Sequence, residues 1–177
     1  PYVKLYVNLL IQNKNYNLAK KFIKKAWNEI PHAEYKDSVL SLATHLEIEM
    51  LELAKYITSA SYKSEESIIL MVEACIESKK WDYARNQIKD LLDVKPKKEV
   101  CLLMAKIEEG DSGDVQKINA WTQRAKNGVA RNIWICAISK KSQQTWSSVS
   151  EGGYFNSLEW RQPIMLESLE IYEESTK

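Results

Sequence analysis

Over most of the first 130 residues, apolar side chains recur three and four positions apart, the spacing of one face of an α-helix. The two clearest stripes consist of Val3, Val7 and Leu10 near the start of the chain, and of Ile68, Met71, Val72 and Cys75 further on. Polar and charged residues fill most positions between them. The pattern therefore predicts amphipathic helices, each of which buries one face against a neighbour.

Two segments of similar sequence follow these stripes, NYNLAKKFIKKAWNEIP at 15–31 and WDYARNQIKDLLDVKP at 81–96. The aligned residues are Ala19, Ile23, Ala26 and Pro31 in one copy, and Ala84, Ile88, Leu91 and Pro96 in the other. A small alanine lets two helices approach closely, and a proline cannot continue a helix. The offset of 65 positions is close to twice the 34-residue period of tetratricopeptide (TPR) repeats, so both segments match the second helix of that repeat.

Two further helix pairs are less regular, and with them the chain is expected to form about four TPR-like pairs over residues 1–130. Residues 32–61 predict a short helix and then a longer one, with Leu42, Leu46, Met50 and Leu53 on one stripe. The fourth pair, at 97–110 and 114–128, is separated by the loop GDSG, in which Asp111 or Ser112 is expected to cap the next helix. Val115 stands there at the position that alanine holds in the other copies.

A segment of different character occupies residues 131–163 and contains Trp134, Trp146 and Trp160, half of the chain's 6 tryptophans. It predicts strands at 133–138 and 145–149, with turns at 140–144 and 152–153. We expect the tryptophans to pack this small β-hairpin or knuckle as a cap on the last helical pair, because a repeat array must cover its final apolar face. Residues 164–177 are expected to form a tail, helical or disordered.

A zinc site in this segment is the first chemistry to consider. Cys136, Ser139, Ser150 and Gly153 stand where a rubredoxin-like knuckle would place two Cys-x-x-Cys pairs. Serine hydroxyls and glycine are not useful zinc ligands, and only the cysteine could act as one. We therefore predict a knuckle without metal, in which buried tryptophan contributes the stability that a metal would give.

Composition and charge exclude several classes of protein. The hydrophobic fraction of 45% predicts a folded chain, and a formal net charge of +1 gives no basic field for nucleic acid. The 3 cysteines are an odd number in unrelated contexts, which favours a reducing compartment over a disulfide framework. No apolar run reaches the length of a membrane span. The opening PYVKLYVNLL begins inside a helical pattern, so we expect a part of a longer protein, with any membrane anchor upstream.

Three stretches resemble the C-terminal half of HemY-type TPR proteins, bacterial inner-membrane proteins named after a heme-biosynthesis operon. They are KKWDYAR at 79–85, CLLMAKIEEGD at 101–111, and the closing segment that ends in FNSLEW at 155–160. The resemblance implies a mainly α fold, an antiparallel helix-pair superhelix of the right-handed α-solenoid type. It also implies a location at the bacterial inner membrane, with this domain soluble and facing the cytoplasm. An unrelated oxidase shares the HemY name, but it needs a dinucleotide fingerprint that this chain lacks.

The concave groove lined by the first helix of each pair is the candidate binding site. Lys4, Asn8, Glu66, Glu73 and Glu77 are assigned to it, and the three glutamates suit a basic or amphipathic segment of a protein partner. Lys4 and Asn8 resemble the start of a carboxylate clamp, but Glu66 stands where that clamp needs a basic residue. A bound C-terminal carboxylate is therefore not expected.

No enzymatic activity, cofactor or metal is expected. His45 has no serine or cysteine nucleophile at the spacing of a catalytic triad. We predict a non-enzymatic scaffold that binds protein partners, among them heme-pathway enzymes, in its groove. A generic envelope-assembly TPR adaptor is the alternative. Direct tetrapyrrole binding is another, with His45 or Cys136 as axial ligand.

Overall fold

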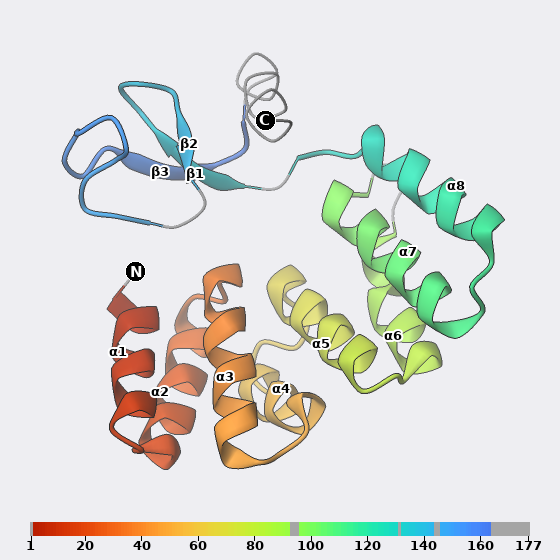
Figure 1. The fold of residues 1–177 in the computed structure, drawn as a ribbon, viewed down its shortest axis with the longest axis horizontal. Coiled ribbons are helices and arrows are strands. Elements are labelled where there is room, and N and C mark those ends of the chain that lie inside the picture. Colours follow the sequence, from red (N-terminus) through yellow and green to blue (C-terminus); the bar gives the residue numbers. More distant parts are fainter. Residues whose placement is uncertain (1, 93–95, 131, 144–145, 164–177) are drawn as a thin grey trace.

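The computed structural model describes residues 2–92, 96–130, 132–143 and 146–163, so the expected tail at 164–177 lies outside it. The described part is mainly helical, with eight α-helices followed by a small antiparallel sheet (Figure 1). In chain order the helices are α1 (Tyr2–Gln12), α2 (Tyr16–Glu29), α3 (Lys36–Leu46), α4 (Met50–Thr58), α5 (Glu65–Glu77), α6 (Trp81–Ile88), α7 (Lys98–Asp111) and α8 (Val115–Lys126). Two 3-10 turns, η1 (Ala33–Tyr35) and η2 (Lys89–Leu91), precede α3 and follow α6.

Consecutive helices pack in pairs, α1 on α2, α3 on α4, α5 on α6 and α7 on α8. Each pair also contacts the next through α2 and α3, α4 and α5, and α6 and α7. The predicted apolar stripes supply one continuous core, in which Val7, Ala19, Ile23, Ala84 and Ile88 are fully buried. Amphipathic helices are stable here because each buries its apolar face against the neighbouring pair.

The first helix of each of the four described pairs ends with a backbone hydrogen bond of the same span. In each, a backbone N–H donates to the carbonyl oxygen five residues earlier. The pairs are Asn15 to Leu10 (2.8 Å), Ile48 to Ala43 (3.2 Å), Lys80 to Cys75 (2.8 Å) and Gly113 to Glu108 (3.0 Å). The four carbonyl positions are 33, 32 and 33 residues apart. A residue with positive φ lies in each turn: Lys14 (59°), Glu47 (55°) and Lys79 (54°) directly before the donor, and Gly113 (64°), which is itself the donor. The helix pairs therefore recur with a nearly constant interval.

The second pair differs from its prediction. α3 has 11 residues and α4 has 9, so the expected order of a short and then a longer helix is wrong. Glu47 in the left-handed region ends α3, and neither glycine nor proline marks this turn in the sequence. Pro96 does not end the second helix of the third pair as predicted, because α6 already ends at Ile88 and η2 at Leu91.

The loop of the fourth pair is shorter than predicted, because α7 continues to Asp111. The cap of α8 is Asp114, whose carboxylate accepts the N–H groups of Gln116 and Lys117, so the prediction of Asp111 or Ser112 is wrong. Val115 is 66% exposed and does not stand at a helix crossing.

The C-terminal sheet has three strands, β1 (Ile133–Cys136), β2 (Ser142–Gln143) and β3 (Leu158–Arg161), in the order β2-β1-β3. β1 agrees with the first predicted strand. Residue 145 of the second predicted strand, 145–149, lies outside the described residues, and 146–149 form no strand, only an isolated bridge between Val149 and Phe155. The chain turns instead at Lys140 (φ 61°) and pairs 142–143 with β1. The third strand was not predicted, and it forms the longer pairing, from Ile133 with Arg161 to Cys136 with Leu158.

The sheet lies over the first helices and not on the last pair as predicted (Figure 1). Tyr2 packs near Trp146, and His32 packs near Trp134 and Trp160. α8 buries Ala125 alone among its described residues, so it offers little apolar surface to the tryptophans. The chain therefore folds back, bringing residues more than a hundred positions apart into contact.

Candidate partner-binding surface

Lys4 and Asn8 are held against the start of α3. Lys4 Nζ lies 3.1 Å from Asp37 Oδ2, and Ser38 Oγ donates to Asn8 Oδ1 at 3.0 Å. The Asn8 amide nitrogen is turned away from this bond, so it can donate elsewhere. Both residues thus link the first helices of two successive pairs, as expected for one face of a repeated array.

A cavity of about 440 Å³ adjoins these two residues. α1 supplies Lys4, Leu5 and Asn8 to its wall, Glu34 comes from η1, and the opposite wall is the loop Trp146, Ser147 and Ser148. The wall combines a cation, an amide, a carboxylate and an indole ring. Because one side belongs to the C-terminal segment, the docked sheet helps to form the candidate surface.

Glu66 and Glu73 line a second, smaller cavity of about 70 Å³, together with Lys36 and Glu99. Lys36 Nζ forms an ion pair with Glu73 Oε1, which joins α3 to α5. The Glu73 side chain is only 14% exposed. Its charge is therefore largely balanced inside the protein by Lys36.

Glu77 lies apart from the other four candidates. It lines a shallow third cavity near the end of α5, beside Glu49 and Met50. The five residues assigned from the sequence are thus distributed over three hollows. The structure brings Lys4 together with Asn8, and Glu66 together with Glu73, but not all five into one site.

A single carboxylate, Glu34, joins the sheet to the helices. Glu34 Oε1 accepts the indole N–H of Trp134 at 2.5 Å and the backbone N–H of Trp146 at 3.2 Å. Hydrogen bonds to an ionised acceptor are stronger than neutral ones. Sequence analysis missed this residue, because its partners lie 100 and 112 positions away.

His32 packs beside Glu34 against the same aromatic cluster. Its ring centroid is 4.6 Å from that of Trp160 and 6.1 Å from that of Trp134, and the two indole rings are 5.1 Å apart. The backbone N–H of Glu34 donates to His32 Nδ1 at 3.2 Å, which fixes the ring in its plane. The sequence indicated that the tryptophans would pack against helices, but it did not identify His32 and Glu34 as their partners.

Cys136, Ser139 and Ser150, three of the four positions compared with a zinc knuckle, come together, and Gly153 is bonded to Ser150. Ser139 N–H donates to Cys136 Sγ at 3.3 Å, and Ser157 Oγ lies 3.2 Å from the same sulfur. Gly153 closes a turn with φ 81°, and its N–H donates to the Ser150 carbonyl oxygen. Burial acts to raise the pKa of Cys136, but hydrogen bonds from Ser139, Ser157 and Ser150 outweigh it and lower the pKa to about 6.

The donors around Cys136 do not fit a structural zinc ion, which needs four thiolates or imidazoles. One thiol and three hydroxyls surround the position. Across the described residues, no three His, Cys, Asp or Glu side chains gather as metal ligands. The hydroxyl bonds instead tie the two turns of the knuckle to one sulfur.

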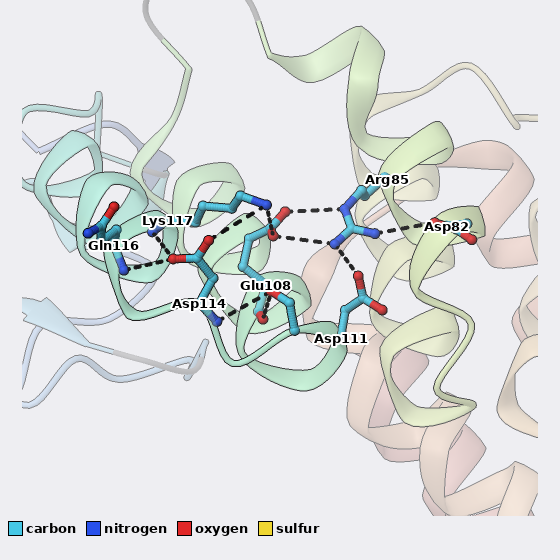
Figure 2. Close-up of polar contacts among 8 residues, drawn as sticks. Asp82, Arg85, Glu108, Asp111, Asp114, Gln116 and Lys117 are labelled. Atoms are coloured by element: carbon cyan, nitrogen blue, oxygen red, sulfur yellow. Dashed lines mark hydrogen bonds and ion pairs between the residues drawn. The ribbon is translucent and has the colours of Figure 1, made fainter.

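A charged network holds α6 to α7 and α8 (Figure 2). Arg85 donates to Glu108 at 3.2 and 3.3 Å, to Asp111 at 2.6 Å and to Asp82 at 3.3 Å. The bonds to Glu108 and Asp111 raise the pKa of Arg85 above its already high value. Lys117 Nζ approaches Glu108 at 3.9 Å from α8. Glu108 occupies the position equivalent to Leu10, Ala43 and Cys75. A charged residue at that position is the feature of the sequence that could have indicated this network.

None of the helices in the described ranges has the length and apolar composition needed to cross a bilayer. His45, one of the two candidate heme ligands, lies on the surface with Nδ1 bonded to the Ser41 carbonyl oxygen at 2.8 Å. Cys136, the other, is 1% exposed. Comparison of the chain with protein-family models, curated proteins and solved structures finds no match.

Proposed function

We propose that this chain is a non-enzymatic scaffold of the TPR type, which binds protein partners along the face formed by α1, α3 and α5. The observation that carries the proposal is the helix ending that recurs at intervals of 33, 32 and 33 residues, close to the TPR period. Packing of each pair on the next supports an α-solenoid, and the resemblance to HemY-type proteins implies the right-handed type. Such arrays typically present extended binding surfaces.

The partner is proposed to offer a basic or amphipathic segment. Glu66 lies in the second cavity and Glu77 in the third, along the same helix α5. Lys4, Asn8 and Trp146 lie in the first cavity, where a polar and aromatic part of the partner would fit. Acidic residues on the array give specificity and faster association with basic segments.

The link to heme rests on the resemblance to HemY-type proteins. On that basis the chain is the soluble part of a bacterial inner-membrane protein, this domain faces the cytoplasm, and its partners include enzymes of heme or porphyrin metabolism. A generic envelope-assembly adaptor would use the same surface with other partners. The nature of the bound proteins therefore separates the two.

Affinity capture from membrane extracts of the native cell, read by mass spectrometry, tests the proposal. The bait is the intact chain, and it is compared with Glu66→Lys/Glu77→Lys, which spares the ion-paired Glu73. Glu47→Lys/Glu52→Lys is the matched control, since both residues are exposed and lie outside the three cavities. Heme-pathway enzymes should be captured by the intact chain and the control and lost with the first variant. Equal capture by all three would overturn the groove assignment.

Hemin titration tests the tetrapyrrole alternative. The scaffold proposal predicts no saturable shift of the Soret band, because Cys136 is enclosed and hydrogen-bonded. A saturable shift that His45→Ala abolishes would replace the scaffold with a tetrapyrrole-binding protein. His32→Ala is the control for loss of a histidine elsewhere.

A further inference from the structure

The first helix pair carries an excess of positive charge that the chain as a whole does not show. Residues 1–28 contain six lysines and no aspartate or glutamate, and the first acidic residue is Glu29, at the end of α2. The formal charge of the whole chain is only +1, so the residues after 28 together carry −5. A charge asymmetry of this kind is typical of a region that meets an anionic surface.

The fold does not neutralise most of these lysines. Within the described part of the chain, Lys4 is the only one of the six that forms an ion pair. Lys20 and Lys24 lie instead over the ring of Tyr56 from α4, with Nζ at 4.7 and 4.0 Å from the ring centroid. A cation–π contact holds an ammonium group in place without cancelling its charge. The side of α2 that faces away from the core is therefore cationic.

Large apolar side chains lie next to this charge. Tyr6 of α1 packs edge-on against Phe22 of α2, with 4.7 Å between the ring centroids. The two helices run antiparallel (Figure 1), so Leu9, three positions after Tyr6, lies level with Leu18, four positions before Phe22. Leu9 is 52% exposed and Leu18 is 50% exposed. The outer side of the first pair thus presents leucines to solvent between two helices.

Exposed lysines border these leucines along α2. Lys21 and Lys25 follow Leu18 by three and seven positions, so the three side chains share one side of the helix. Tyr2 and Leu5, nearer the start of α1, lie against the C-terminal loop at 146–148 and belong to a different surface. We call the remaining surface the first-pair face, and it consists of Tyr6, Leu9, Leu18, Lys21, Phe22 and Lys25.

We propose that the first-pair face binds the surface of an anionic phospholipid membrane. Leu9 and Leu18 would enter the interfacial layer, and Lys21 and Lys25 would lie among the headgroup phosphates. A lipid surface matches both chemistries, because phosphates and acyl chains meet there within the length of one lysine side chain. A nucleic acid offers phosphates but no acyl chains, so it would leave the leucines without a partner.

The proposal concerns a different side of the array from the groove of α1, α3 and α5. It rests on the charge and exposure of the first pair, and not on the protein partner proposed for that groove. Loss of one activity would therefore leave the other intact. Attachment through this face would place the chain on a membrane without any helix crossing it.

Vesicle flotation of the 177-residue chain tests the charge requirement. The chain should float with vesicles of phosphatidylcholine mixed with phosphatidylglycerol, and not with phosphatidylcholine alone. Raising the salt from about 0.1 M to about 1 M should release it. Lys21→Glu/Lys25→Glu should weaken binding at least about tenfold. Lys106→Glu/Lys126→Glu is the matched control, since both lysines are exposed and lie on α7 and α8, and it should bind like the wild type.

A fluorophore tests the apolar requirement. An environment-sensitive dye on Leu18→Cys should brighten and shift to the blue when mixed vesicles are added, whereas the same dye on Lys106→Cys should not. The native cysteines are buried, so they give little background labelling. Leu9→Ser/Leu18→Ser should weaken binding at least about threefold, with the helical circular dichroism spectrum unchanged.

Three results would overturn the proposal. Equal binding to both kinds of vesicle, or to neither, would show that the chain does not recognise anionic lipid. Equal weakening by Lys21→Glu/Lys25→Glu and by its control would show that no particular face is used. Charge-dependent binding without any response of the dye would show that the leucines do not enter lipid, and tighter binding to a DNA duplex than to mixed vesicles would assign the face to nucleic acid.

Discussion

Replacing Arg85 with alanine tests whether the charged network holds the third helix pair to the fourth. The guanidinium donates two bonds to Glu108, at 3.2 and 3.3 Å, and one to Asp111 at 2.6 Å. The Glu108 side chain is only 7% exposed, so Arg85→Ala leaves a nearly buried carboxylate. The remaining cation near it is Lys117, at 3.9 Å.

The expected cost follows from this geometry. Removing one partner of a buried ion pair costs about 3–5 kcal/mol. The Arg85 side chain is 29% exposed and Lys117 remains, so solvent and the second cation reduce the cost to about 2 kcal/mol. In a chain of this length, 1 kcal/mol shifts the melting temperature by about 2–4 °C, so Arg85→Ala should lower it by about 4–8 °C.

Thermal unfolding followed by circular dichroism measures the change. Asp82→Ala is the control, because the Asp82 side chain is 98% exposed and its bond to Arg85 should contribute less than about 1 kcal/mol. Adding Glu108→Leu to Arg85→Ala should recover part of the loss, since it removes the carboxylate that lacks a partner. If Arg85→Ala melts like Asp82→Ala, or if the second substitution deepens the loss, the reasoning is wrong.

Three further predictions concern the C-terminal segment. The pKa of Cys136 is about 6 in the folded state and 9.0 without the fold, so stability should rise with pH from 6 to 9, and Cys136→Ser should flatten that rise in thermal melts. Trp160 is half-buried, so Trp160→Ala should lower the free energy of unfolding by about 2 kcal/mol, less than the 3–5 kcal/mol of a fully buried ring. A chelator should not change the melting temperature of the wild type. Glu34→Gln should weaken the bonds to Trp134 and Trp146 and shift tryptophan emission to the red, whereas Asp37→Asn should not.

The helices could be predicted from the sequence because helix periodicity is local. Val7, Ile23, Ala84 and Ile88 lie in the core as their spacing indicated. The turns were harder, since Lys14, Glu47 and Lys79 adopt positive φ without being glycine. The packing of the helix pairs stabilises these turns, and the sequence of a single segment does not reveal that packing.

The candidate surface could be predicted only as a set of helix positions. The pattern placed Glu73 correctly on a helix, but its ion pair with Lys36 depends on how α3 and α5 pack. The docking of the sheet was mispredicted for the same reason, because Glu34 and Trp134 are 100 positions apart and nothing local links them. Contacts between distant segments are decided by the whole fold.

The chain folds back, so that the sheet docks on the first helices through His32, Glu34 and the tryptophans. A nuclear Overhauser measurement between the His32 imidazole protons and the Trp160 indole protons tests it most directly. With 4.6 Å between the ring centroids, we expect a clear cross-peak that Trp160→Phe removes or moves to new aromatic frequencies. Assigned resonances of both rings without any cross-peak would contradict the claim.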